Sequence, residues 1–313
     1  MQIQKIFILF ALFAGLMMDS FLAYNPPARA ESETNHLPDI SGLAWIEQDT
    51  FLAVHDAKNP EENNRPRVSI LSLPRTPEGI QWKPLEIDWP PPLKESSDLE
   101  SIARIPGTSL FLLVESGESI YNGQRFGRIF LIELKDEKPI IRSFTQLPTT
   151  TKNIEGSAVF RSGDRLTFVC AERGDHQIGT KLFWADLKLE PFELGKFKQT
   201  YFKPGNFTGK NKRPVSAIEI DKQGQMYIAS AYDSDDDNGP FTSVIWRAGR
   251  ISADRTGKFR LNLLSRPVEL ARLDGLKVES LAIRWREQAA QELFAGTDDE
   301  NYGGAIRLIP DQK

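Results

Sequence analysis

The sequence predicts an all-β protein, a β-propeller of five four-stranded blades, with six blades as the alternative and a β-sandwich as a more distant one. Three observations predict it. A short phrase recurs five times, each copy precedes further short apolar runs bounded by turn residues, and no stretch beyond the first thirty residues keeps a helical period over three turns. Five units also suit the length, because 313 − 30 leaves 283 residues, or about 57 for each blade.

The recurring phrase places a polar residue at the start of an apolar, strand-like run. Its five copies are ISGLAWI (40–46), LESIARI (99–105), IEGSAVF (154–160), VSAIEI (215–220) and VESLAI (278–283). Taking the second residue of each copy as its anchor gives Ser41, Glu100, Glu155, Ser216 and Glu279, separated by 59, 55, 61 and 63 residues. Repeats of this kind, built from β-branched and aromatic runs, are typical of propeller blades.

Each copy is followed by two more apolar runs and, in most copies, by a more polar fourth run. In the second unit these runs are SLFLLVE (109–115), GRIFLIELK (127–135) and KPIIRSFTQL (138–147). The fifth unit is shorter, since 313 − 279 leaves only 34 residues after Glu279, enough for three strands. The sequence is compatible with two ways of closing the ring of blades. Either a short N-terminal segment around 35–39 completes the ring, or the last blade lacks its outer strand.

The first thirty residues have the composition of a secretory signal peptide. A basic start, MQIQK, precedes the apolar run IFILFALFAGLMM (6–18), and Ala28-Arg29-Ala30 offers small residues at the spacing of a cleavage site. We expect cleavage after Ala30, a secreted or periplasmic protein, and a single propeller domain over 31–313. An uncleaved membrane anchor is the alternative, and no membrane association is expected after cleavage.

The rest of the composition excludes several classes of function. The formal net charge of −4 argues against nucleic acid as a partner. There is no Cys/His spacing for zinc, no Gly-rich phosphate loop and no G-x-S-x-G nucleophile motif. The single cysteine, Cys170, cannot form an internal disulfide. We expect Cys170 to be buried as a small apolar side chain. We also expect the protein to be a monomer.

Acidic residues are predicted to surround one mouth of the central channel. In an up-and-down blade, the start of the innermost strand and the end of the second strand lie at the same end. The second runs end at His55-Asp56, Glu115, Glu172-Arg173, Asp233 and Asp298-Asp299, beside the glutamates of the anchor set. Because like charges this close repel, we expect a hard divalent cation with oxygen ligands, Ca²⁺, to lie among them.

The predicted metal ligands are oxygen donors near this mouth: Glu100, Asn153, Glu155, Glu279, Asp56, Glu115, Asp233 and Asp298. The predicted catalytic groups are Glu155 or Glu172 as general base, Arg173 to stabilise developing negative charge, and His55 as a further candidate base. Arg173, Lys152 and Arg213 are placed to hold an anionic substrate. The structural alternative is that these acids cap turns or pair with lysines.

Three phrases, SGLAW…FLAVHD (41–56), DLESIA…FLLVES (98–116) and NIEGSAV…FVCAERGD (153–175), resemble the secreted phytase-like propellers, the "esterase-like activity of phytase" family. They are similar, more loosely, to the SdiA-regulated and gluconolactonase/regucalcin-like propellers. The resemblance covers most of the chain after the predicted signal. It implies a propeller with a metal, usually calcium, at the channel mouth, and hydrolysis of phosphoesters, esters or lactones in the active members.

The resemblance also implies roles for particular residues. The D-x-E-G-x-A phrase of the family gives Asp98 and Glu100, the N-x-E-G phrase gives Asn153 and Glu155, and the following E-R gives Glu172 and Arg173. The chain departs from the family pattern at Ser101, which replaces a glycine, and at Ser41 and Ser216, where an acid is expected.

Two functions are therefore predicted. The first is a metal-dependent hydrolase that acts on a small anionic or ester substrate. The second is a non-catalytic secreted propeller with a structural metal, whose acidic mouth binds a ligand or a partner protein.

Overall fold

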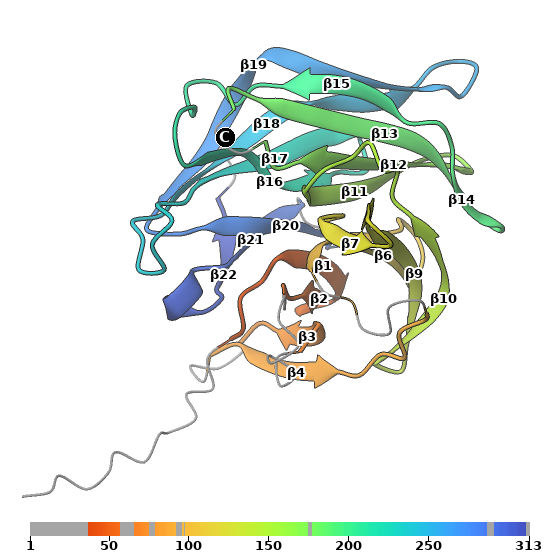
Figure 1. The fold of residues 1–313 in the computed structure, drawn as a ribbon, viewed down its shortest axis with the longest axis horizontal. Helices are drawn as coiled ribbons and strands as arrows, with labels where there is room; N and C mark the ends of the chain where they lie inside the picture. The colour runs from red at the N-terminus through yellow and green to blue at the C-terminus, as the bar shows by residue number, and fades with distance from the viewer. Residues whose placement is uncertain are drawn as a thin grey trace, which may run out of the picture. The chain divides into compact units, whose positions relative to one another are not determined.

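The computed structural model describes residues 37–56, 66–74, 79–91, 96, 98–174, 177–286 and 291–310. From Leu37 onward the chain forms one unit, a β-propeller of five blades, which confirms the predicted fold class (Figure 1). The predicted signal peptide, 1–30, lies outside the described residues.

The first two blades are antiparallel sheets of four strands. Blade one consists of β1 (Gly42–Glu47), β2 (Thr50–Val54), β3 (Val68–Ser72) and β4 (Gln81–Leu85). Blade two consists of β5 (Leu99–Arg104), β6 (Leu110–Glu115), β9 (Arg128–Lys135) and β10 (Lys138–Gln146). A small hairpin, β7 (Ser119–Tyr121) and β8 (Gln124–Phe126), is inserted between β6 and β9.

The remaining blades vary this plan at their outer edges. Blade three consists of β11 (Ile154–Ser162), β12 (Arg165–Glu172), β13 (Thr180–Leu189), β14 (Phe192–Leu194) and β15 (Lys198–Phe202), and both β14 and β15 pair with β13. Blade four consists of β16 (Lys212–Ile220), β17 (Gln225–Tyr232), β18 (Thr242–Ala253) and β19 (Phe259–Asp274). Blade five has β20 (Val278–Arg284), β21 (Glu292–Thr297) and β22 (Ile306–Ile309), with a 3₁₀ turn, η2 (Glu300–Tyr302), before its last strand.

The ring closes between blades five and one, and both predicted closures contribute. Within the described residues blade five has three strands, and the segment before β1 bonds to it. Ile40 donates its backbone N–H to the carbonyl of Thr297 at 3.0 Å, and Gly304 donates its own to the carbonyl of Leu37 at 2.8 Å. The two ends of the propeller are therefore tied together by backbone hydrogen bonds.

The core lies between blades rather than within them. The innermost strands β1, β5, β11, β16 and β20 contact one another in this order, and β20 contacts β1 again. Five apolar clusters fill the five gaps between neighbouring blades. At the closure, the rings of Phe51 and Phe294 meet edge to face with centroids 5.2 Å apart. Since each cluster needs two blades, no blade can bury its apolar faces alone.

The place of a strand within its blade explains its sequence. β20 is buried at all of its residues, because both faces of an inner strand pack against neighbouring blades. β10, at an outer edge, alternates exposed and half-buried residues along its length. This difference accounts for the apolar first three runs of the repeats and for the more polar fourth run where a repeat has one.

Cys170 on β12 is buried in the cluster between blades two and three, as predicted. Burial raises the pKa of its thiol, and the charge of Glu172 adds to the effect, so the group stays protonated and unreactive. The turn η2 is the helical segment that the described part of the chain contains, and no helix there could cross a membrane.

Candidate functional site at the acidic channel mouth

Three glutamates, Glu100, Glu155 and Glu279, occupy the same irregular position in β5, β11 and β20. The residues on either side of Glu100 pair with two consecutive residues of β6, so Glu100 is the extra residue of a β-bulge. The same shift brackets Glu155 and Glu279 in their own blades. A bulge bends its strand and re-aims a side chain. Three inner strands can thus each present a carboxylate at the start of the channel.

These glutamates form one carboxylate group. Each places one oxygen within 4.8 Å of an oxygen of the other two, and the exposed fractions of Glu100, Glu155 and Glu279 are 5%, 2% and 4%. Burial raises the pKa of Glu279, and the nearby charge of Lys277 opposes that rise. Carboxylates this close and this deeply buried must either keep a proton or have positive charge beside them.

Arginines from blades three and four supply part of that charge. Arg173 Nη1 lies 3.3 Å from an oxygen of Glu155. Arg213 donates one hydrogen bond to Glu279 and another, from Nη2 at 2.6 Å, to Asp233. Two of the three glutamates therefore form ion pairs with arginine side chains that the sequence placed on this face.

Lys277 supplies the rest from blade five. Its ammonium nitrogen lies 3.0 Å from Asp298 and 3.6 Å from both Glu279 and Asp233, and it donates a hydrogen bond to Glu300. Only 1% of the residue is exposed. Burial alone would lower the pKa of this lysine, but the surrounding carboxylates raise it above its usual value. Lys277 is thus a permanent buried cation among four acids.

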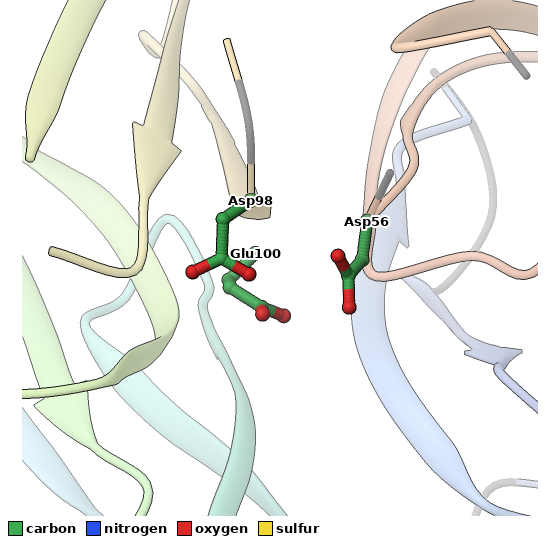
Figure 2. Close-up of side chains that lie close together, drawn as sticks. All are labelled: Asp56, Asp98 and Glu100. Carbon is green, nitrogen blue, oxygen red and sulfur yellow. The ribbon is translucent and has the colours of Figure 1, made fainter. Parts of the chain in front are cut away.

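A second carboxylate group shares Glu100. Figure 2 shows Asp56 facing Asp98 and Glu100, and one oxygen from each lies within 4.8 Å of the others. Asp98 also accepts a hydrogen bond from the hydroxyl of Ser116. Carboxylate oxygens converging from two blades are the donors that Ca²⁺ and Mg²⁺ take. The residues present therefore fit a hard divalent cation.

Of the eight predicted metal ligands, the structure brings four into these groups: Asp56, Glu100, Glu155 and Glu279. It adds Asp98 to them. The other four predicted ligands make different contacts within the described part of the chain, and the metal assignment of all eight stays a prediction.

Glu115 is held inside blade two. Arg128, with none of its surface exposed, donates from Nη2 and from its backbone N–H at 2.7 Å each, one bond to each carboxylate oxygen. Ser96 adds a third donor at 2.7 Å. Both oxygens of Glu115 are engaged within the blade.

Asp233 and Asp298 belong to the charge network of Lys277. Burial acts to raise the pKa of Asp233, but Arg213 and Lys277 hold it below its ordinary value. Asp298 lies 3.0 Å from the ammonium nitrogen of Lys277, closer than Asp233 and Glu279 at 3.6 Å. These two carboxylates thus already contact a protein cation.

Asn153 and Glu172 flank Arg173. With its amide turned to suit its neighbours, Asn153 accepts hydrogen bonds from Arg173 Nε at 2.9 Å and Nη2 at 3.1 Å. Glu172 is half-buried and accepts the backbone N–H of Lys152 at 3.1 Å. Burial raises its pKa, against the opposing charge of Lys181. A carboxyl with a raised pKa at a mouth of this kind suits acid–base chemistry.

His55 is engaged within blade one. Its Nδ1 donates to the carbonyl of Asp39 at 2.6 Å, because a carbonyl can only accept, and its Nε2 then accepts from the hydroxyl of Ser69 at 2.7 Å. Burial lowers its pKa to about 4, although the Asp39 carbonyl favours the charged form. His55 is therefore neutral at pH 7 with both ring nitrogens bonded, and we assign it no part in a reaction.

Sequence reasoning missed Lys277 and Arg128. A signal for Lys277 was present, since it stands two residues before Glu279, at the position that Asp98 and Asn153 hold before their own glutamates. A lysine where other repeats carry an oxygen donor indicates local charge compensation. Arg128 lies outside the repeated phrase, and no pattern distinguished it from a surface arginine.

Beneath the carboxylates the channel is nearly closed. The cavity there is about 10 Å³, room for no more than one water molecule. The hydroxyls of Ser101 and Ser157, which line it from neighbouring inner strands, hydrogen-bond to each other at 2.7 Å. A Cβ atom added at Gly42 or Gly156 would lie 2.8 Å from a backbone nitrogen of the neighbouring inner strand. The acidic mouth is thus a shallow site that the packed inner strands close from below.

The sequence matches no protein-family model and no curated protein. Solved structures share its fold. A thermostable family-43 glycoside hydrolase is 11% identical with a TM-score of 0.51, over 87% of this chain and 88% of its own. An exo-β-1,3-galactanase from Clostridium thermocellum is 11% identical with a TM-score of 0.51, over 89% of this chain and 62% of its own. At these identities the likeness supports the propeller architecture.

Proposed function

We propose that the protein is an exported, calcium-dependent hydrolase of phosphoesters or small esters, and that its site is the acidic channel mouth. The observation that carries this proposal is the placing of two kinds of group at one mouth. Asp56, Asp98 and Glu100 form a set of oxygen donors from blades one and two, and Arg173 and Arg213 lie at the same mouth on blades three and four. An anionic ester needs both, because a cation polarises one of its oxygens while guanidinium groups bind the others.

The resemblance of 98–116 and 153–175 to the phytase-like propellers supports the same substrate class. The likeness to the family-43 glycoside hydrolase concerns the fold alone, so glycosidic chemistry is not carried over from it. The choice of phosphoester or ester therefore rests on the charges at the mouth and on this resemblance.

The chain's own residues have separate tasks in this proposal. Asp56, Asp98 and Glu100 would hold the Ca²⁺, which when bound polarises a phosphoryl or carbonyl oxygen. Glu155 or Glu172 would accept the proton of the attacking water. Arg173 already contacts Glu155 and would stabilise the negative charge that develops on the substrate.

A second candidate is the non-catalytic propeller with a structural metal. The Lys277 network favours it, because a protein ammonium group already neutralises acids that a catalytic cation would otherwise bind. In this case the mouth binds a ligand or partner without turnover.

Calcium titration of the exported form, followed by assays on p-nitrophenyl phosphate and p-nitrophenyl acetate, tests both candidates. We expect calcium binding, a melting temperature that falls with chelator, and turnover that requires calcium. Glu100→Gln removes the residue shared by both carboxylate groups and should weaken calcium binding at least about tenfold. Glu172→Gln should keep calcium and lower turnover about 100-fold or more if it is the base.

Glu193→Gln is the matched control, since Glu193 is 57% exposed and contacts only Lys188 among the described ion pairs. It should change neither calcium binding nor turnover. Calcium binding without turnover of either substrate would favour the non-catalytic candidate. If chelator changes neither melting temperature nor turnover, the metal proposal fails, and turnover of aryl glycosides in place of both esters would overturn the substrate class.

A further inference from the structure

The opposite mouth of the channel holds a pocket of about 480 Å³, which we call the distal pocket. It is lined by the far ends of all five inner strands, for example Trp45 of β1, Arg104 of β5, Phe160 of β11, Ile220 of β16 and Ile283 of β20. Pockets of 300–1,000 Å³ hold small molecules in most proteins. The inner strands therefore place two different concave sites at their two ends.

The walls of the distal pocket are largely apolar and aromatic. Trp45, Phe160, Ile283 and Trp285 line it, and Phe160 and Ile283 are buried. A flat apolar body of one or two rings suits such walls, because indole and phenyl faces pack against ring-shaped ligands.

Three cations line the pocket. Arg104 lies 5.1 Å from the Trp45 ring centroid, and Lys222 lies 4.3 Å from that of Trp285. Arg161 donates from Nε to the carbonyl of a neighbouring-blade proline at 2.8 Å. None of these three cations pairs with a carboxylate within 4 Å among the residues that the structure describes, although Glu47 acts on Arg104 from farther away.

Two acids also line the pocket beside these three cations, and burial keeps one of them, Glu219, protonated at neutral pH. The oxygen of Glu219 accepts the backbone N–H of Ile220 at 2.8 Å, and burial raises its pKa to about 8, with Asp221 adding to the rise. Asp221 is bonded to the backbone N–H groups of Gln223 and Gln225 at 2.9 and 2.8 Å, and Gln291 donates to it as well. A protonated Glu219 is a hydrogen-bond donor on the pocket wall.

We propose that the distal pocket binds a small molecule with a flat apolar body and a carboxylate group. The aromatic walls would enclose the body, Arg161 and Lys222 would attract the carboxylate, and Glu219 would donate a hydrogen bond to it. This site lies at the other end of the channel from the proposed hydrolytic site and does not depend on it.

The test uses 1-naphthoate as the probe, with 1-naphthylmethylamine as its cationic counterpart, and measures binding by calorimetry at pH 7. We expect naphthoate to bind at least tenfold more tightly than the amine. Lys222→Gln and Arg161→Gln should each weaken naphthoate binding about 2–5-fold, the size of a partly exposed ion pair. Trp285→Ala should weaken binding of naphthoate more than tenfold.

The pH dependence supplies a second, independent readout. Naphthoate affinity should fall above about pH 8, where Glu219 loses its proton and repels the ligand. Glu219→Gln keeps a donor but cannot titrate, so it should remove this decline. Because Lys222 is exposed, Lys222→Gln does not threaten folding, and it should leave ester turnover at the acidic mouth unchanged.

Two outcomes would overturn the proposal: equal binding of the amine and naphthoate, or unchanged naphthoate affinity in both Lys222→Gln and Arg161→Gln. Glu100→Gln serves as the control from the acidic mouth. The proposed function predicts weaker calcium binding in this variant. Naphthoate binding should not change in it, whatever the calcium result.

Discussion

The two mouths of the channel are built from the same five strands and treat charge in opposite ways. At the acidic mouth, Glu279 lies 3.6 Å from Lys277 and is bonded to Arg213. In the distal pocket, the oxygen of Glu219 has a backbone N–H as its partner and lies among apolar walls. Burial raises the pKa of both glutamates, but a cation opposes the rise only at Glu279. The pairing of a charge, more than its burial, therefore decides what a mouth can bind.

Backbone geometry is the origin of this difference. Bulges at the starts of β5, β11 and β20 gather three carboxylates at one end. Towards the other end, the pairing of β20 with β21 is regular, and its residues follow the alternation of the pleat. The same strand can therefore carry a polar site at one end and an apolar pocket at the other.

Removal of Lys277 is the largest expected change. Lys277→Met should lower the free energy of unfolding by about 3–5 kcal/mol at pH 7, because it leaves buried carboxylates without their cation. Urea unfolding would measure it. The loss should be smaller at lower pH, because a protonated carboxyl group needs no cation beside it.

Lys188→Met is the control for that change, since Lys188 is 70% exposed and lies 3.7 Å from the exposed Glu193. It should alter stability by no more than about 0.5 kcal/mol. Equal losses in the two variants would contradict the view that the acidic mouth depends on internal charge pairing.

His55 should make the folded state sensitive to acid. Its pKa of about 4 in the folded protein lies below the ordinary 6.5, so between these values the unfolded chain binds a proton that the folded chain does not. The stability contribution is complete above pH 6.5 and is lost as pH falls towards 4, by about 3 kcal/mol in total. The free energy of unfolding of His55→Asn, measured by urea unfolding, should therefore vary less with pH over that range. An equal pH dependence in the variant and the unchanged protein would show that His55 is not the source of the acid sensitivity.

The floor between the mouths should not accept a side chain at Gly156. Its Cβ would lie 2.8 Å from the backbone nitrogen of Ile218, so Gly156→Ala should cost about 1–3 kcal/mol by forcing two inner strands apart. Gly195→Ala, whose nearest contact is an ordinary 3.4 Å, is the control and should stay within about 0.5 kcal/mol. Thermal unfolding compares the two, and an equal effect would show that the channel is looser than its contacts imply.

Glu219 should show the smallest effect on stability. Its pKa of about 8 exceeds the ordinary 4.5, so stability falls as pH rises between those values, when the unfolded chain loses a proton that the folded chain keeps. The free energy of unfolding of Glu219→Gln, relative to that of the unchanged protein, should therefore rise by about 1–2 kcal/mol between pH 5 and pH 8.5. The effect is modest because the side chain is partly exposed. A difference that does not vary with pH would contradict the raised pKa.

Much of the architecture could be predicted from local pattern. The run RLTFVCAE coincides with β12, and the outer run KPIIRSFTQL covers β10 and extends one residue beyond it. The short fifth repeat left room for three strands, and the last blade has three within the described residues. Strand periodicity and turn residues involve only a few neighbouring positions, so they can be recognised in the amino-acid sequence.

The contacts within the site were harder to predict from the sequence. Glu100, Glu155 and Glu279 were correctly placed together, since equivalent residues of a closed ring must converge. Their bulges were not predicted, because a bulge is a relation between two paired strands. The pairing of Glu115 with Arg128 also depends on which strand lies beside which.

The repeat, the strand order and the mouth at which acids gather can be predicted from the chain alone, because these depend on spacing and on side-chain polarity along it. The folded ring is needed to show which acids lie together and which are neutralised by Arg173, Arg213 and Lys277. It also shows that a second pocket forms at the far ends of the same strands. The reason is physical. Ion pairing and desolvation act over a few ångströms in space, and residues such as Arg213 and Glu279 reach that distance only when separate blades close into a ring.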